Sequence, residues 1–166
     1  MPKHRAIITA SLVLALAALV PASAAAKAGG TDRPVSGKTT STTTVDLATG
    51  TGISDGSGQL SHIGASTFHN DFSGFTVTGT TFNWTQTATI VAANGDEIFA
   101  TAVGTGTLLP DGTSEATLVS TITGGTGRFA DASGTLTSSI SSVTVSMVGT
   151  TITSNDTETH TGLISY

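Results

Sequence analysis

The sequence predicts an all-β protein that folds as a single closed antiparallel β-barrel of about eight strands. Threonine, valine, isoleucine and glycine dominate the chain after residue 38, and β-branched side chains fit a pleated sheet better than a helix. Residues 81–92 alternate between two faces with the period of two that is typical of a half-buried strand. The expected strands also lack the lysines and prolines that protect a free sheet edge, and a closed barrel has no such edge.

The N-terminal residues carry the pattern of a secretory signal peptide. Lys3 and Arg5 precede an apolar run over residues 6–20, and small residues around Ala24 supply an A-x-A cleavage site. The run is shorter than the roughly 20 residues of a membrane-spanning helix, which disfavours the alternative of a retained anchor. We therefore expect residues 1–26 to be a signal peptide, the protein to be secreted and extracellular, and no membrane contact after cleavage.

The remaining chain reads as a short leader followed by one domain. Residues 27–38 combine glycine, proline and polar side chains without periodicity, so we expect a flexible leader there. Residues 39–166 have a length that suits a single core, and we expect them to form the β-barrel domain. The chain contains no cysteine, which excludes disulfides, thiol catalysis and zinc–thiolate sites.

Apolar alternation and turn residues mark the expected strands in order. Val45, Leu47 and Ile53 are apolar at odd positions, so we expect a first strand over residues 43–53. The further expected strands cover residues 81–92, 96–109, 114–123, 135–148 and 151–166.

Two turns and one irregularity follow from particular residues. Asn94-Gly95 is typical of a type I′ hairpin turn, in which both central residues have positive φ. Pro110 sets the backbone for the next turn, which continues through Asp111-Gly112. The apolar positions change parity between Ile140 and Val143, which predicts a bulge or bend.

The charge of the chain excludes one class of partner. Of the eleven acidic residues only Asp32 precedes Lys38, and the sole basic residue after Lys38 is Arg128. A nucleic-acid groove cannot be built without cations that neutralise phosphates. An anionic membrane surface is disfavoured for the same reason.

The stretch "ITGGTGRFADASG" (122–134) spaces Gly125, Gly127 and Ala130 as G-x-G-x-x-A, like the turn that binds a dinucleotide. That function requires a helix of normal length after the glycines and an acidic residue about 20 positions onward. Gly134 leaves room for one helical turn only, and no Asp or Glu occurs between Asp131 and Asp156. The stretch therefore predicts a tight connection between strands, and the sequence indicates no cofactor.

The same stretch resembles the glycine turn of the allene oxide cyclase-like and dirigent-like β-barrels. "LSHIGAST" (60–67) and "AANGDEIFAT" (92–101) are similar to segments of the bacterial secreted members, in the same order. The resemblance implies an eight-stranded antiparallel barrel with an internal apolar cavity, often in a homo-oligomer. Plant members cyclise a fatty-acid epoxide or steer phenoxy-radical coupling, whereas most bacterial members lack an assigned activity.

The resemblance carries no catalytic residue onto this chain. Ala65 stands where bacterial relatives often have a basic residue, and the polar pocket residues of the plant enzymes have no counterparts that match one by one. Whether the protein is an enzyme is therefore left open by its sequence, with the absence of catalysis favoured.

One strand supplies the candidate ligand-binding residues. Phe82, Trp84 and Ile90 share a face of the strand over residues 81–92, and Gln86 interrupts that face. An aromatic wall with one polar group is typical of a small-molecule pocket. We therefore propose Phe82, Trp84, Gln86 and Ile90 as ligand-binding residues; the alternative is a plain core in which the amide bonds to a neighbouring strand.

Ionisable residues at two places could carry chemistry. Asp156, Glu158 and His160 project from one face of a strand, and such groups can hold a metal or transfer a proton. The favoured alternative is a solvated outer face and no metal site. His62 and His69 have opposite parity, so we expect structural histidines there rather than a metal pair.

Together these features predict a secreted β-barrel protein that binds a small apolar or amphipathic molecule inside the barrel. One alternative is a cyclase or isomerase for a lipid or phenolic substrate, which requires an acid or base within the barrel. A further alternative is a cell-surface structural or assembly protein whose threonine-rich strands mediate association.

Overall fold

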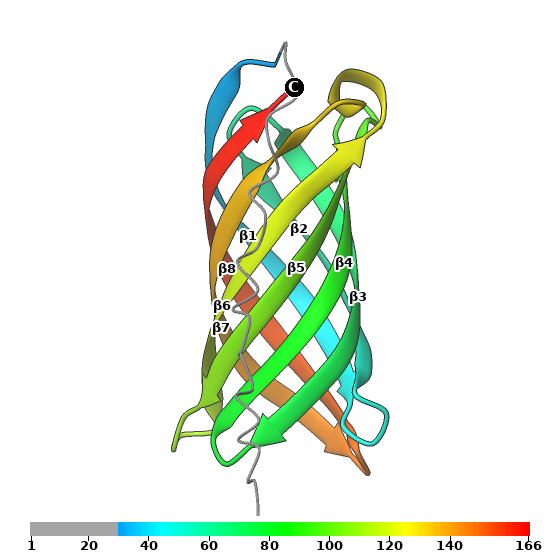
Figure 1. Ribbon diagram of the computed structural model, residues 1–166. Coiled ribbons are helices and arrows are strands. Elements are labelled where there is room, and N and C mark those ends of the chain that lie inside the picture. Colours follow the sequence, from blue (N-terminus) through cyan, green and yellow to red (C-terminus); the bar gives the residue numbers. More distant parts are fainter. Residues whose placement is uncertain (1–29) are drawn as a thin grey trace, which may run out of the picture.

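The alternation of side chains continues through eight strands in the computed structural model, which describes residues 30–166. These are β1 (Asp32–Asp46), β2 (Thr51–Leu60), β3 (Gly64–Thr78), β4 (Thr81–Ala92), β5 (Glu97–Leu108), β6 (Thr113–Gly125), β7 (Ser133–Val148) and β8 (Thr151–Ser165). Each strand pairs antiparallel with the next, and β1 also pairs with β8, so the sheet closes on itself (Figure 1). The predicted all-β class and closed antiparallel barrel are confirmed.

The first strand begins earlier than the sequence suggested. Residues 32–38, expected within a flexible leader, pair with Thr159–Ser165 of β8, and Val35 is buried. Pro34 pairs with Leu163 of β8, but its β2 side is unpaired because the pairing of β1 with β2 starts only at Gly37. Proline is tolerated at such an edge position. The lower boundary of the barrel domain therefore moves from residue 39 to Asp32.

The single strand expected over residues 43–53 is two strands joined by a turn. β1 ends at Asp46 and β2 starts at Thr51. Gly50 takes the positive φ of 67° that the reversal needs, and the Asp46 carboxylate accepts a hydrogen bond from the backbone N–H of Ala48 at 2.9 Å. Val45, Leu47 and Ile53 all stand at odd positions in the sequence. The alternation of apolar residues therefore continues across the turn and does not reveal it.

The two predicted turns have different outcomes. The turn at Pro110-Asp111-Gly112 is present, with a hydrogen bond from the Gly112 N–H to the Leu109 carbonyl at 3.1 Å. The type I′ assignment at Asn94-Gly95 is wrong, because Gly95 has a φ of 85° whereas Asn94 is not among the described residues with positive φ. A hydrogen bond from Gly95 to Ala92 places Gly95 after the two central residues instead of between them.

The glycine-rich connection between β6 and β7 contains only a three-residue 3₁₀-helix, η1 (Gly127–Phe129). The Phe129 side chain is fully buried and contacts Tyr166 edge-on, with ring centroids 4.7 Å apart. This agrees with the prediction of a tight connection. A dinucleotide turn would need a longer helix than this connection provides.

A bulge occurs in β7, but later than expected. The pairing with β8 shifts between Thr144 and Ser146, after the predicted position. Ile140 faces the interior and Val143 the exterior, where it is exposed. The apolar positions in the sequence therefore change parity because Val143 lies on the outer wall of the barrel. This change precedes the bulge.

Side chains inside the barrel form three layers along its axis. An apolar cluster fills the end of the barrel near the C-terminus, the closed end. The cluster contains Val35, Leu60, Ile63, Ala92, Ile98, Ile122, Phe129, Ala132, Leu136 and Ile164. A second cluster of Phe82, Trp84, Ala102 and Leu118 lies toward the opposite end. Polar side chains occupy the middle layer. No helix among residues 30–166 has the length and apolar character needed to cross a membrane.

Candidate functional site

A cavity of about 280 Å³ lies inside the barrel. It is at the end formed by the β1–β2, β3–β4, β5–β6 and β7–β8 hairpins, because residues next to each of these turns line it. Its apolar walls include Phe72, Phe75, Phe82, Trp84, Leu118 and Ile140, and Asn70, Gln86, Asp156 and Glu158 face it from the middle layer. An apolar enclosure with a few converging polar groups is the usual form of a small-molecule pocket.

Four stacked or tilted aromatic rings form one wall of the cavity. Phe82 stacks on both Phe75 and Trp84, with centroid distances of 5.5 and 5.7 Å, and Phe72 lies 6.1 Å from Trp84. The Trp84 indole N–H donates to the Gln86 side-chain oxygen at 2.8 Å. The buried indole is therefore satisfied within the wall, and the wall has fixed ring positions.

Glycines on the next strand make room for these rings. Trp84 and Phe82 pair across the ladder with Gly104 and Gly106 of β5. A Cβ atom at either glycine would lie 2.2 Å from the facing ring. The sequence thus places the largest side chains of β4 opposite the smallest residues of β5.

The four candidate ligand-binding residues divide between two places. Phe82, Trp84 and Gln86 are buried and line the cavity. Ile90 faces the interior too, but it is partly buried and packs against the apolar cluster at the closed end. The sequence did not single out Phe72, Phe75 or Asn70, since the register of β3 shifts between Ser73 and Thr76 and interrupts its alternation.

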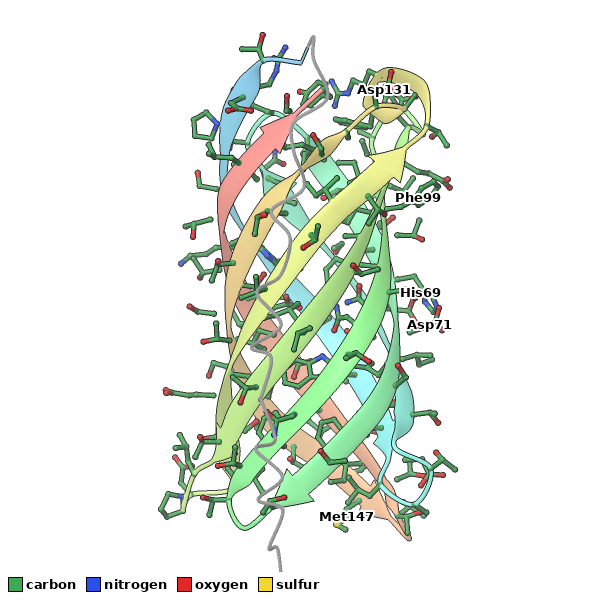
Figure 2. All side chains as sticks on the ribbon, in the orientation of Figure 1. His69, Asp71, Phe99, Asp131 and Met147 are labelled. Carbon is green, nitrogen blue, oxygen red and sulfur yellow. The ribbon has the colours of Figure 1, made fainter. Side chains whose placement is uncertain are left out.

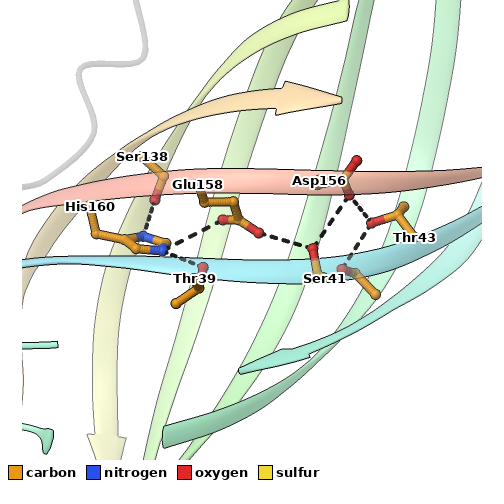
Figure 3. Close-up of polar contacts among 8 residues, drawn as sticks. Thr39, Ser41, Thr43, Ser138, Asp156, Glu158 and His160 are labelled. Atoms are coloured by element: carbon orange, nitrogen blue, oxygen red, sulfur yellow. Dashed lines mark hydrogen bonds and ion pairs between the residues drawn. The ribbon is translucent and has the colours of Figure 1, made fainter. Parts of the chain in front are cut away.

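Asp156, Glu158 and His160 of β8 share one face, and that face points into the barrel (Figure 3). Asp156 and Glu158 are 8% and 6% exposed, so the favoured expectation of a solvated outer face is wrong. Hydroxyl groups from the adjacent strands β1 and β7 surround these side chains and make their burial tolerable. The cyclase alternative requires an acid or base inside the barrel, and Asp156 and Glu158 meet this requirement. The cyclase alternative therefore stays a prediction.

Asp156 is the better satisfied of the two buried carboxylates. Its Oδ2 accepts hydrogen bonds from Thr43 and, at 3.4 Å, from Ser41. Its Oδ1 accepts from Ser154 at 2.9 Å. Three hydroxyl groups thus lie within hydrogen-bonding distance of this side chain in the middle layer.

Glu158 has a weaker set of partners. Its Oε1 accepts from Ser41 Oγ at 3.3 Å, and its Oε2 lies 3.8 Å from His160 Nε2. Burial and, secondarily, the charge of Asp156 raise the pKa of Glu158 to about 7. The cavity therefore contains a carboxyl group that changes charge near neutral pH.

His160 ties β8 to both of its neighbours. Its Nδ1 lies 2.7 Å from Ser138 Oγ of β7, and its Nε2 lies 2.8 Å from Thr39 Oγ1 of β1. Burial lowers the pKa of His160, which favours the neutral ring. Ser138 is buried and neither residue lines the cavity, so this contact does not present a serine nucleophile to a ligand.

The other two histidines of residues 30–166 lie away from the cavity. His69 is on the outer wall of β3, with Nδ1 2.7 Å from Asp55 Oδ1 and Nε2 3.5 Å from Asp71 Oδ1 (Figure 2). His62 lies in the β2–β3 turn, where its carbonyl accepts a hydrogen bond from the Tyr166 hydroxyl at 3.1 Å. In the part of the chain that the structure describes, no three or more histidines and carboxylates are arranged to hold a metal ion.

A larger hollow of about 630 Å³ extends over the outer wall across β5, β6, β7 and β8. Its side chains are mainly threonine and serine hydroxyls, with Glu115 and Leu109 at the side. It brings together no pair of ionisable groups and no aromatic ring. The interior cavity is therefore the stronger candidate site although it is smaller.

Searches of protein-family models, curated proteins and solved structures give no match to this chain. The closed pairing of the eight strands establishes the fold class. The resemblance to allene oxide cyclase-like and dirigent-like proteins stays a prediction.

Proposed function

We propose that this protein is a secreted β-barrel that binds a small apolar or amphipathic molecule in its interior cavity. The observation that supports this function is the cavity lined by the Phe72, Phe75, Phe82 and Trp84 rings, with polar groups at its inner side. Its volume of about 280 Å³ is near the lower end of the roughly 300–1,000 Å³ common for ligand pockets. Secretion rests on the signal-peptide pattern of residues 1–26.

A ligand entering at the hairpin end would first meet apolar side chains. Leu47, Val77, Leu108 and Ile152 line the cavity at the ends of their strands or in the adjoining turn. The carboxylates lie deeper, on the inward face of β8. This gradient suits a molecule with an apolar body and one polar group.

Binding can be tested with N-phenyl-1-naphthylamine, whose fluorescence rises in apolar surroundings. We expect saturable binding by the purified protein with a Kd on the order of micromolar. Ala116→Phe places a ring in the cavity and should weaken binding at least about tenfold. Thr117→Phe adds the same ring to the exposed side of β6 and should leave binding unchanged.

Circular dichroism of each variant establishes that the barrel is folded. Native mass spectrometry of the unaltered protein with the probe gives a second reading that does not depend on a variant. Equal fluorescence with Ala116→Phe and unaltered protein would place the probe elsewhere and overturn the proposal. Absence of any complex in both measurements would do the same.

A further inference from the structure

The charges inside the barrel are one-sided. Asp156 and Glu158 face the cavity, and the cations of residues 30–166 are Arg33, Lys38 and Arg128. None of these three lines the cavity.

Each of the cations lies elsewhere on the barrel. The Arg33 guanidinium lies 4.6 Å from the centre of the Tyr166 ring at the closed end. Arg128 donates to the Ile63 carbonyl at 3.0 Å, also at the closed end, and Lys38 is exposed on β1. Within the described residues, the buried carboxylates of the cavity therefore have no lysine or arginine counter-charge.

The polar side chains around the cavity are not fully hydrogen-bonded within the barrel. The hydroxyl of Ser41 lies within reach of both Glu158 and Asp156, but its single proton can serve only one of them at a time. The Asn70 amide is 7% exposed, lines the cavity and has no side-chain hydrogen bond to any residue of the range 30–166. Buried polar groups are usually paired, so these groups indicate a ligand with hydrogen-bond donors.

The aromatic wall suits the same ligand. Phe72 and Trp84 line the cavity together with Glu158, and an ammonium group over an aromatic face is attracted by the ring quadrupole. A fatty acid or other anion would instead bring a third negative charge toward Asp156 and Glu158, which is unfavourable at low dielectric.

We infer that the ligand of this cavity is a hydrophobic primary amine, bound as its ammonium ion by Glu158 and Asp156, with Asn70 completing the polar contacts. This inference rests on the proposed binding function and specifies its ligand class. The hydrocarbon or aromatic part of the amine lies against the Phe82 and Trp84 rings.

Three compounds of nearly equal size separate the charge from the apolar contact: 2-phenylethylammonium, 2-phenylethanol and phenylacetate. Each is titrated against the purified protein, with Trp84 fluorescence and displacement of N-phenyl-1-naphthylamine as readouts. Trp84 is the only tryptophan of the chain and it lines the cavity, so its emission reports on the site. We expect the ammonium compound to bind at least about tenfold more tightly than the alcohol, and the carboxylate to bind most weakly.

The pH dependence gives a second measurement. The titratable groups facing Glu158 are Asp156 and His160 of its own strand. β1 contributes the neutral hydroxyl of Ser41, and the β7 residue that pairs with Glu158 is the apolar Ile140. Because the pKa of Glu158 is about 7, raising the pH from 5.5 to 8 ionises it while the amine stays protonated. Binding of the amine should tighten about tenfold over this range, and binding of the alcohol should not.

Glu158→Gln keeps the shape of the side chain and removes its charge. The variant should lose most of the preference for the amine over the alcohol, together with the pH dependence of that preference. Asp71→Asn removes one charge from the outer wall and should change neither.

The outcomes distinguish the inference from the function on which it rests. Equal binding of amine and alcohol, or binding of the naphthylamine probe without displacement by the amine, overturns the inference and leaves the binding function standing. Failure of the naphthylamine probe itself overturns both.

Discussion

At the scale of single residues, Glu158 carries the clearest consequence of the fold. Desolvation favours the protonated carboxyl, and the neighbouring charge of Asp156 adds to this effect. The pKa of Glu158 is thereby raised from 4.5 to about 7. Its ionisation at neutral pH therefore opposes folding and favours the binding of a cation.

The first prediction concerns stability against pH. Because the pKa of Glu158 is higher in the folded than in the unfolded state, its contribution to stability is complete below about pH 4.5 and is lost as the pH rises to about 7. Glu158→Gln should match the unaltered protein in free energy of unfolding at pH 4.5 and exceed it at pH 8 by on the order of 3 kcal/mol. Urea unfolding at both pH values measures this difference.

His160 affects stability in the opposite direction. Its pKa is lowered by burial, so stability falls as the pH drops below about 6.5, where the unfolded chain takes up the proton first. The histidine is present in both proteins, so its contribution largely cancels in the comparison. A constant difference between Glu158→Gln and the unaltered protein from pH 4.5 to 8 would contradict the assignment.

At the scale of elements, the pairing of β4 with β5 builds the aromatic wall. The Trp84 and Phe82 rings lie over Gly104 and Gly106, which have no side chain in the way. Glycine normally weakens a strand, since it has no side chain to pack and loses more entropy on folding. Here it gives the facing rings the space that they need.

A substitution at one of these glycines tests this packing. Gly104→Ala adds a Cβ about 2.2 Å from the Trp84 ring and forces the indole to move. We expect the free energy of unfolding to fall by about 1–3 kcal/mol, the usual cost of overpacking. Denaturant unfolding measures the loss, and near-ultraviolet circular dichroism reports the displaced indole.

The matched control lies one residue away on the same strand. Val103 is exposed on the outer face of β5, and Val103→Ala should change stability by no more than about 0.5 kcal/mol. Equal losses at Gly104 and Val103 would show that the strand as a whole, and not the contact with Trp84, responds to substitution.

At the scale of the whole molecule, closure of the barrel depends on β1. This strand pairs with β2 on one side and with β8 on the other, and its first residues pair with β8 alone. Val35 lies within this first part and belongs to the apolar cluster of the closed end. The N-terminal part of β1 therefore contributes both backbone pairing and core packing.

Two truncations locate the functional start of the domain. A protein that begins at Asp32 retains all of β1, whereas one that begins at Thr39 loses Val35 and the partners of residues 159–165. We expect the shorter protein to be less stable by at least about 2 kcal/mol, since burial of one valine alone contributes roughly 1.5–3 kcal/mol. Thermal unfolding compares the two, and equal midpoints would restore residue 39 as the boundary.

Several features of the site were predictable from local sequence. A period of two assigns residues to faces, so Phe82, Trp84 and Gln86 could be placed together, and so could Asp156, Glu158 and His160. The same reasoning misplaced the start of β1, because Pro34 and Gly37 are typical of a linker unless a distant strand pairs with them. It also missed Asn70, which has no sequence pattern of its own.

The sequence by itself determined that this chain alternates as a β-protein, closes without an edge and carries an aromatic stripe on one strand. Only the tertiary structure decided which face of β8 is inside. The reason is that burial of a carboxylate depends on its partners: Ser41 and Thr43 lie more than 110 positions away from Asp156 in the chain. Barrel closure brings β1 beside β8, and the hydroxyls of one strand then allow the acids of the other to face the cavity.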